Sequence, residues 1–523
     1  MTDVRSETTL AGLGAAELAR RIRARDVSSA EVVEAHIARI EEVNPRLNAV
    51  VVSLFEQARG EARMADREQE PKGLLHGVPI TIKEQFDVAG HDSTWGLRKQ
   101  RGKPAAQDGP MVSRLRQAGG IVLGITNVPQ LLLYAESDNP VYGRANNPWS
   151  LDRTPGGSSG GEGAIIAAGG SPLGLGGDIG GSIRVPAHFC GIQGLKPTSW
   201  RLTRRDNPAR YASGGEGIVH QVGPIARRVE DLRLAMEVLA APGQDAFDWS
   251  IPPVPWPDPA RVDVGRLRIA MYANDGFFPA APAVRRAVGE AAGALRAAGA
   301  EVSEWSPPDV SDAMDMFFGL LGADGGQSSR RLVKGDELTP QVKGLIQIVS
   351  TPTFVRGPLA AAMAALGHPR LAATVGSLRP LTADQFWLLL ERANRFRSDF
   401  VAGLLAGGFD AVICPPHALP ALTHGASYWL TTAASYSMLY NMLGMPAGVA
   451  AVTRVAPGEE SDRPPSKDRV DKAAAQVERD SAGLPVGVQV VGRHWREDVV
   501  LAVMSAVEAG VRGAPGYPET PPL

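Results

Sequence analysis

Serines lie in and just after the most glycine-rich stretch of the chain, and a serine hydroxyl is a potential nucleophile. Residues 156–181 hold 12 glycines in 26 positions; they include Ser158 and Ser159, and Ser182 follows directly. Glycine at this density lets backbone N–H groups turn inward and approach a ligand closely, as in an anion or oxyanion pocket. A flexible linker is the alternative, but the apolar run 164–168 is typical of a buried helix and argues against it.

Other functions of a glycine-rich loop can be tested by spacing. The chain has no G-x-x-x-x-G-K-[ST] motif, and residues 174–181 do not fit G-x-G-x-x-G, so both phosphate-binding patterns are excluded. Residues 156–160 match G-x-S-x-G, the nucleophile elbow of Ser-His-Asp hydrolases. Glycines continue on both sides of this match and two serines compete for the central position. The pattern is therefore weak, and this alternative stays open.

A nucleophilic serine needs a base. The nine histidines (36, 76, 91, 188, 220, 368, 417, 424 and 494) form no recognisable triad or metal motif, so no metal or other cofactor is expected. No serine is followed by the S-x-x-K spacing of penicillin-recognising enzymes. Lys83 remains, at the end of the apolar run 78–82. A lysine at a strand end is usually a solvated charge, but in an apolar, hydrogen-bonded site its pKa falls and it can act as a base.

Composition points to a small-molecule partner. The 523 residues carry 54 basic and 56 acidic side chains, a net charge of −2, which gives no field that favours nucleic acid or an anionic membrane. Cys190 and Cys414 cannot form a disulfide framework, and no secretion signal is recognisable, so we expect a reducing, cytoplasmic location. The uncharged stretch 411–453 contains several prolines, which favours a buried core segment over a membrane span.

Strand and helix patterns alternate along the chain, which is typical of an α/β fold with a mixed or largely parallel sheet. Ser28 and Glu31 form a capping-box pattern that begins a helix, and Asn44-Pro45 is expected to end it. The proline-rich residues 252–259 predict an extended connector, and the highly charged residues 457–480 a solvated loop with a short helix. Further helices are expected at 111–118 and 283–298, and strands at 77–83, 120–124, 267–271, 411–414, 445–449 and 484–490.

Several of these segments together resemble the amidase signature family of serine hydrolases, and within it the fatty acid amide hydrolase-like branch. The resemblance is carried by residues 155–165 and 170–198 and by segments 77–90, 126–129 and 484–492. It implies an α/β amidase signature fold, a large twisted mixed β-sheet flanked by helices on both faces. It also implies a single domain over 1–523, with a core at about 70–230 and 400–510, a variable substrate-pocket region at about 310–440 and a charged surface insert at 457–480.

The resemblance also implies a role for each site residue. Ser182 would be the nucleophile, Ser158 a bridging serine after a cis peptide bond, and Lys83 the general base. Such a base would draw the proton from a hydroxyl that is otherwise a poor nucleophile. The implied oxyanion hole consists of the amides of Ile179, Gly180, Gly181 and Ser182, and the groups that hold the loops are Ser159, Asp178 and Arg184.

The expected reaction is hydrolysis of the C–N bond of small aryl or alkyl amides through an acyl-enzyme. Esters, carbamates (urethanes) and fatty-acid amides are further candidate substrates. Four other functions rank lower: a Ser-His-Asp esterase, an amidotransferase subunit, a transferase to ammonia or hydroxylamine, and a binding module. The expected pocket residues, for which ordinary core is the alternative, are Met314, Met316, Phe317, Phe318, Leu320, Leu321, Trp387, Trp429 and Tyr436. The sequence does not reveal the oligomeric state; a homodimer is one candidate.

Overall fold

The computed structural model describes residues 10–205 and 217–523. At its centre lies a sheet of eleven strands in the order β1-β3-β2-β4-β6-β5-β10-β11-β9-β7-β8. The strands are β1 (Val50–Ser53), β2 (Pro79–Lys83), β3 (Ile121–Thr126), β4 (Leu173–Asp178), β5 (Gln193–Lys196), β6 (Gln221–Ala226), β7 (Arg268–Met271), β8 (Glu301–Glu304), β9 (Ala411–Cys414), β10 (Ala447–Arg454) and β11 (Pro485–Gly492).

The sheet is mixed, as the sequence predicts. Strands β3, β2 and β4 are parallel neighbours, and β7 is parallel to both β8 and β9, whereas the remaining pairs are antiparallel. In the register of β2 with β4, Thr81 lies opposite Gly174. Every residue of β2 and β4 is buried, which explains their continuous apolar or glycine-rich sequence. The parallel trio brings the carboxyl ends of β2 and β4 to the same edge.

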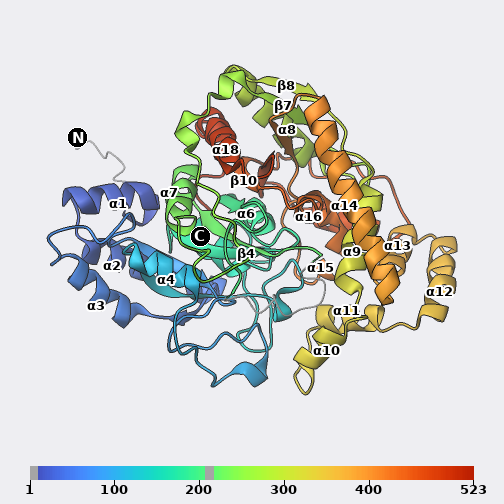
Figure 1. Cartoon of the computed structure of the whole chain (residues 1–523), viewed down its shortest axis with the longest axis horizontal. Coiled ribbons are helices and arrows are strands. Elements are labelled where there is room, and N and C mark those ends of the chain that lie inside the picture. The colour runs from blue at the N-terminus through green and yellow to red at the C-terminus, as the bar shows by residue number, and fades with distance from the viewer. Residues whose placement is uncertain (1–9, 206–216) are drawn as a thin grey trace.

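Helices cover both faces of the sheet (Figure 1). Helices α7 and α8 both pack on α18, and all three pack on the central strands. Helices α5 and α6 pack on the central strands as well, with α2 outside α5. A Cβ at Gly448 of β10 would meet Met504 of α18, whereas the next residue, Val449, belongs to the α5–α6 core cluster. Since neighbouring strand residues point to opposite faces, the two helix layers lie on opposite faces. Together with α1, α3 and α4 of the N-terminal part, these helices are α1 (Ala15–Ala24), α2 (Ser29–Leu47), α3 (Phe55–Ala65), α4 (Pro110–Gln117), α5 (Gly160–Ala167), α6 (Arg184–Cys190), α7 (Val229–Leu239), α8 (Pro282–Ala297) and α18 (Glu497–Val511).

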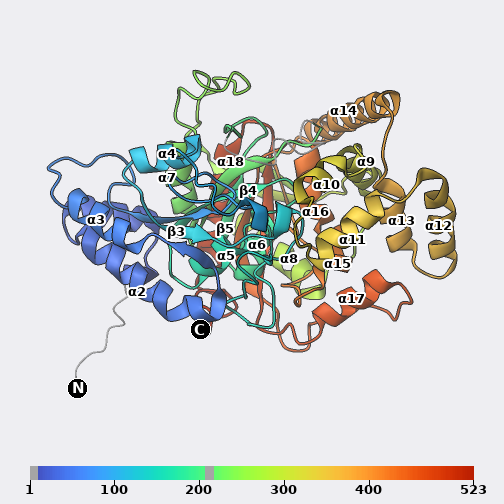
Figure 2. The same ribbon diagram turned by 90° about the horizontal axis from the view of Figure 1, so that it is seen from below.

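A group of helices lies beside the sheet, and its members α10 to α13 project at one side in both views (Figures 1 and 2). Helix α9 packs on α13, α14 and α16, which connects this group to the core. The helices are α9 (Val310–Gly322), α10 (Gln327–Val333), α11 (Pro340–Val349), α12 (Thr353–Ala365), α13 (Pro369–Ser377), α14 (Ala383–Ala406), α15 (Ser427–Leu430), α16 (Ser435–Met442) and, in the charged segment, α17 (Arg469–Glu478).

Two local predictions need correction. The capping box at Ser28 begins α2 as expected, but the helix continues through Pro45 to Leu47, where Asn48 in the left-handed conformation donates its N–H to the carbonyl of Asn44 and closes the last turn. The charged segment 457–480 contains a short helix, α17, but it is not wholly solvated. Glu478 is fully buried because it pairs with the Arg463 guanidinium at 2.7 Å.

Candidate active site

Lys83 and Ser158 are in direct contact inside the protein. The Lys83 ammonium nitrogen lies 2.8 Å from Ser158 Oγ and 3.3 Å from the Gly177 carbonyl oxygen. Lys83 is fully buried at the end of β2. Burial lowers the pKa of Lys83 to about 7, and the acidic side chains of Asp178, Glu162 and Glu84 act in the opposite direction when they are ionised. An uncharged amine that can accept a proton is therefore available near neutral pH.

Glycine places Ser158 beside the lysine. The peptide bond between Gly157 and Ser158 is cis, as the family resemblance implies, and α5 begins two residues later at Gly160. A Cβ at Gly157 would lie 2.4 Å from the Tyr134 carbonyl oxygen, closer than any real side chain allows. Glycine is required here because the backbone passes so near a neighbouring chain segment.

Ser182 lies on a loop that contacts the Ser158–Ser159 loop. It is partly exposed, between the end of β4 and the start of α6, whereas Ser158 is buried. Its carbonyl oxygen accepts a hydrogen bond from the Ser159 N–H at 3.1 Å, which ties the two serine-bearing loops together. Within residues 10–205 and 217–523, no hydrogen bond joins the hydroxyls of Ser158 and Ser182. The structure thus joins Lys83 to Ser158 and holds Ser182 on an adjoining loop.

The backbone amides before Ser182 fall into two groups. The Gly181 N–H donates to the Asp178 carboxylate at 2.8 Å, so its hydrogen is already engaged. The N–H groups of Ile179, Gly180 and Ser182 make no hydrogen bond within the described ranges. All three residues are partly exposed. These three N–H groups are therefore free to donate hydrogen bonds to an anion. The predicted fourth donor, the Gly181 N–H, is already engaged by Asp178.

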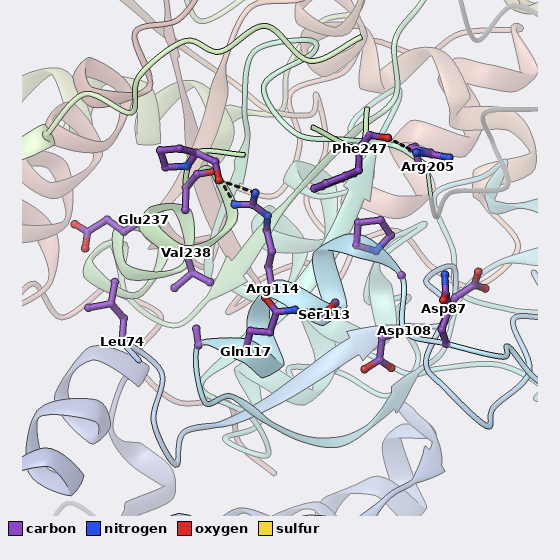
Figure 3. Close-up of a pocket in the computed structure, with 16 residues that line it drawn as sticks. Leu74, Asp87, Asp108, Ser113, Arg114, Gln117, Arg205, Glu237, Val238 and Phe247 are labelled. Carbon is purple, nitrogen blue, oxygen red and sulfur yellow. Dashed lines mark hydrogen bonds between the residues drawn. The ribbon is translucent and has the colours of Figure 1, made fainter. Parts of the chain in front are cut away.

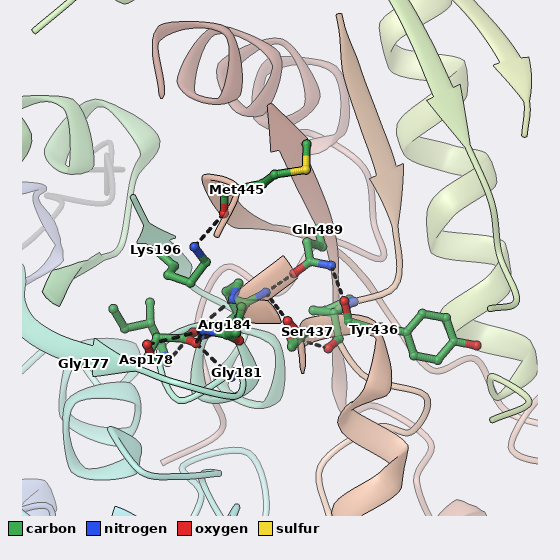
Figure 4. A network of polar contacts seen from close by, with 12 residues as sticks. Gly177, Asp178, Gly181, Arg184, Lys196, Tyr436, Ser437, Met445 and Gln489 are labelled. Atoms are coloured by element: carbon green, nitrogen blue, oxygen red, sulfur yellow. Dashed lines mark hydrogen bonds and ion pairs between the residues drawn. The ribbon is translucent and has the colours of Figure 1, made fainter. Parts of the chain in front are cut away.

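A buried ion pair fixes this loop (Figure 4). The Arg184 guanidinium donates to the two carboxylate oxygens of Asp178 at 2.8 and 3.0 Å, and neither side chain is exposed. Burial alone would raise the pKa of Asp178, but the charge and hydrogen bonds of Arg184 outweigh it and hold that pKa well below its usual range. The carboxylate stays ionised and holds the amides of Gly181 and Ile183. Both residues thus occupy the loop-holding positions expected of them.

Arg184 also connects the loop to the C-terminal half of the chain. It donates to the Ser437 carbonyl at 2.9 Å and to the Gln489 side-chain oxygen at 2.6 Å, and it contacts the Asn441 side-chain oxygen. Sequence reasoning missed Asn441 and Gln489. The one available signal was a polar glutamine inside the apolar strand β11, which marks a buried hydrogen-bonding site.

Removing the charge of Asp178 is expected to destabilise the protein strongly. Asp178→Asn keeps the shape of the side chain but leaves Arg184 buried without its counter-ion, which typically costs about 3–5 kcal/mol. Urea unfolding followed by tryptophan fluorescence measures the change. The matched control is Glu337→Gln, which removes the exposed ion pair with Arg98 and is expected to change stability little. Equal stability of Asp178→Asn and wild type would contradict the assigned role of the pair.

Two predicted pocket residues have clear but different positions. A Cβ at Gly180 would lie 3.4 Å from the Phe317 ring, and 3.7 Å from Met438 of α16, so apolar side chains of α9 and α16 border the amide loop. Trp387, in contrast, is 68% exposed on α14, so it is not part of the core. The other predicted residues are buried or partly buried in the core, namely Met314, Met316, Phe318, Leu320, Leu321, Trp429 and Tyr436.

A cavity of about 1030 Å³ lies elsewhere, between α4 and α7 (Figure 3). Its walls include Arg114, whose guanidinium donates to the carbonyl oxygens of Ala241 and Pro242 at 2.6 and 3.0 Å. Lys83, Ser158 and Ser182 are not among the residues that line it. This cavity is therefore separate from the candidate active site.

The contacts of Ser159 and of the histidines test the alternative that residues 156–160 form the nucleophile elbow of a Ser-His-Asp hydrolase. Ser159 Oγ faces the Gly177 backbone, with both its hydrogen bonds there at 3.4 Å. No histidine in the described ranges hydrogen-bonds to Ser158, Ser159 or Ser182. The described residues therefore contain no hydrogen-bonded Ser-His pair at this site, and the base in contact with Ser158 is the Lys83 amine.

Comparison with known proteins identifies the family. The sequence profile described as Amidase matches residues 31–501. The chain belongs to the Amidase family. It is 38% identical over 519 residues to fatty-acid amide hydrolase 1 of Sus scrofa, which covers 97% of this chain and 87% of the relative. The protein is thus an amide hydrolase.

Solved structures agree with this assignment. A fatty acid amide hydrolase superposes with a TM-score of 0.84 and 25% identity, covering 97% of this chain and 86% of its own. A bacterial aryl acylamidase superposes with a TM-score of 0.74 and 25% identity, covering 98% and 99%. The amidase signature fold expected from the sequence is confirmed. Across the described part of this amidase, no helix combines the length and apolarity needed to span a bilayer.

Proposed function

We propose that this amidase cleaves carboxylic amides with Ser182 as nucleophile, Ser158 as proton bridge and Lys83 as base. The observation that carries the proposal is the 2.8 Å contact between the buried Lys83 nitrogen and Ser158 Oγ, together with the lowered pKa of Lys83. A neutral amine can donate to the Gly177 carbonyl and still accept a proton from Ser158 through its lone pair. The pair is therefore poised to activate a second hydroxyl.

Acylation begins when Ser182 Oγ attacks the amide carbonyl carbon. Its proton passes to Ser158 Oγ as Ser158 passes its own proton to Lys83, so that a new C–O bond forms while Lys83 becomes an ammonium ion. Negative charge develops on the carbonyl oxygen. The free amides of Ile179, Gly180 and Ser182 would stabilise that oxygen, and one such donor contributes about 2.7–4 kcal/mol in hydrolases.

Collapse of the tetrahedral intermediate breaks the C–N bond. The proton on Lys83 returns through Ser158 to the departing nitrogen, which leaves as a neutral amine, and Ser182 remains acylated. Water then attacks the acyl carbon with the same proton relay and releases the carboxylic acid. The ionised Asp178 takes no proton in this cycle, because Arg184 keeps its pKa far below the working range.

We further propose that the substrates are small aryl or alkyl amides and that the protein works in the cytoplasm. Phe317 and Met438 beside Gly180 provide apolar surface next to the reacting carbonyl, and the free cysteines Cys190 and Cys414 accord with a reducing compartment. Fatty-acid amides form the second candidate class, favoured by the similarity to fatty-acid amide hydrolase 1 over 97% of this chain.

A substrate screen tests both classes. Initial rates are compared for p-nitroanilides, fatty amides, simple carboxamides, aryl carbamates and esters, each with the wild type and Ser182→Ala. The proposal requires amide cleavage that the variant lacks. Cleavage of esters or carbamates alone would contradict it, and added hydroxylamine, with hydroxamate measured as product, distinguishes hydrolysis from acyl transfer.

A further inference from the structure

A second buried acid lies directly behind the candidate site. Glu162 on α5 is fully buried, and its two carboxyl oxygens lie 2.6 Å from Thr81 Oγ1 and 3.0 Å from Thr126 Oγ1. A Cβ at Gly174 of β4 would fall 1.9 Å from the same carboxyl group. The carboxyl therefore occupies a space that β4 leaves open through a glycine, and it touches both other strands of the parallel trio.

Two neighbouring contacts join β2 to the segment formed by α5 and the loop just before it. Thr81 and Lys83 are two residues apart on β2 and so point to the same face. Ser158 lies two residues before α5 begins at Gly160, and Glu162 lies in the first turn of that helix. The pairs Lys83–Ser158 and Thr81–Glu162 thus lie side by side. The Thr81–Glu162 contact therefore also helps to set the distance between Lys83 and Ser158.

The surroundings of the Glu162 carboxyl favour its uncharged form. Within the described chain no Lys, Arg or His nitrogen forms an ion pair with it, and its partners are two hydroxyl groups. Asp178 is equally buried, but it has a guanidinium, two loop amides and an Asn441 amide. Burial raises the pKa of Glu162 to about 8, whereas that of Asp178 is lowered.

We propose that Glu162 is a positioning residue, a neutral carboxylic acid that joins β2 and β3 to α5 and thereby holds Lys83 at hydrogen-bonding distance from Ser158. The inference rests on the proposed role of Lys83 as base. In the structure the Thr81 and Thr126 hydroxyls donate to the carboxyl oxygens at 2.6 and 3.0 Å. In the protonated form the carboxyl O–H would instead donate to Thr81 Oγ1, while the other oxygen still accepts from Thr126, so no counter-ion is needed.

The neutral form matters because of the lysine. The buried charged groups and histidines on or beside the elements packed against α5 are Lys83 on β2, Asp178 on β4, Arg184 and His188 on α6, His36 on α2 and His220 just before β6. Of these, Lys83 acts on the Glu162 charge. An ionised Glu162 would favour the ammonium form of Lys83, which cannot accept a proton.

Four variants test the proposal. Glu162→Gln keeps the shape and a neutral donor–acceptor pair, so we expect near wild-type kcat/KM and an unchanged midpoint of its acid limb. Glu162→Leu removes both hydrogen bonds, and Gly174→Ala pushes the carboxyl away; each is expected to lower kcat by about 100-fold with KM little changed, as for a misplaced catalytic group. Gly60→Ala, with nothing within 4 Å of the new methyl group, is the control for glycine replacement.

A spectroscopic measurement reports the charge directly. The infrared difference between the wild type and Glu162→Gln at pH 6.5 (about 1.5 units below the Glu162 pKa of about 8) is expected to show the C=O band of a protonated carboxylic acid. A purely structural role would not require that band. The measurement needs no catalysis, so it remains informative if Glu162→Leu or Gly174→Ala folds poorly.

Three results would overturn the proposal. One is a carboxylate band in place of the acid band. Another is a fall of about 1–3 units in the acid-limb midpoint of Glu162→Gln, which would mean that an anion had been removed from beside the lysine. The third is full activity of both Glu162→Leu and Gly174→Ala. Failure of the underlying triad is distinguishable, because Lys83→Met would then keep activity whatever the state of Glu162.

Discussion

Replacing Ser182 by alanine is expected to lower the hydrolysis rate by at least about 10⁴-fold, because the acyl-enzyme cannot form without the nucleophile. The amides of Ile179 and Gly180 would remain in the variant and could still polarise a bound carbonyl. Binding of substrate should therefore survive while turnover is lost. Rates with a p-nitroanilide, together with KM or inhibitor affinity, measure the two effects separately.

Ser159→Ala is the matched control for this prediction. Ser159 lies one residue from Ser158, yet its hydroxyl contacts the Gly177 backbone at 3.4 Å and not the lysine. A serine-reactive fluorophosphonate should label the wild type and Ser159→Ala, but not Ser182→Ala, and peptide mass spectrometry should find the adduct on Ser182. An adduct on Ser159, or undiminished turnover by Ser182→Ala, would favour the elbow alternative.

The site owes its geometry to one edge of the sheet. Lys83 ends β2 and Asp178 ends β4, and parallel pairing brings these carboxyl ends together, the usual place for ligands in open α/β sheets. The loop after β4 carries Ser182, and the loop just before α5 carries Ser158. Short distances along the chain therefore connect each reacting group to a buried strand or helix, which restricts its motion.

Much of this could be predicted from sequence, because the relevant signals are local. The apolar run before Lys83 predicted a buried strand ending in an amine, and the glycines around Ser158 predicted close backbone approach. The alternation of strands and helices predicted a mixed α/β sheet. Each of these depends on residues a few positions apart, where periodicity and glycine content are informative.

The rest depends on contacts between distant segments. Arg184 meets Gln489, 305 residues further along the chain, and no local pattern predicts which buried arginine a strand glutamine will reach. The engaged amide of Gly181 depends on the orientation of one carboxylate. Trp387 looked like pocket lining because it is large and apolar, yet the exposed face of α14 carries it. Side-chain direction in these cases is set by tertiary packing.

Activity is expected to fall as pH drops through about 7, with the protonation of Lys83 as the cause. Burial lowers the Lys83 pKa to about 7, so below that value the ammonium form dominates and has no lone pair to accept the Ser158 proton. One proton is involved, so kcat/KM should decline about tenfold for each pH unit on the acid limb. In Lys83→Ala or Lys83→Met, the rate near pH 7 should fall by about 10²–10⁴-fold, and the remaining activity should rise with pH as hydroxide replaces the base.

Lys196 provides a matched control for that assignment. It is also fully buried and burial lowers its pKa to about 7, but its nitrogen donates to the carbonyl oxygens of Met445 and Pro197 and makes no contact with Ser158. Lys196→Met should therefore keep an acid limb near pH 7, even if the fold is weakened. Because both lysines titrate in the same range, the wild-type profile alone cannot separate them. If the acid limb disappears in Lys196→Met and persists in the Lys83 variants, Lys83 is not the group whose protonation limits activity.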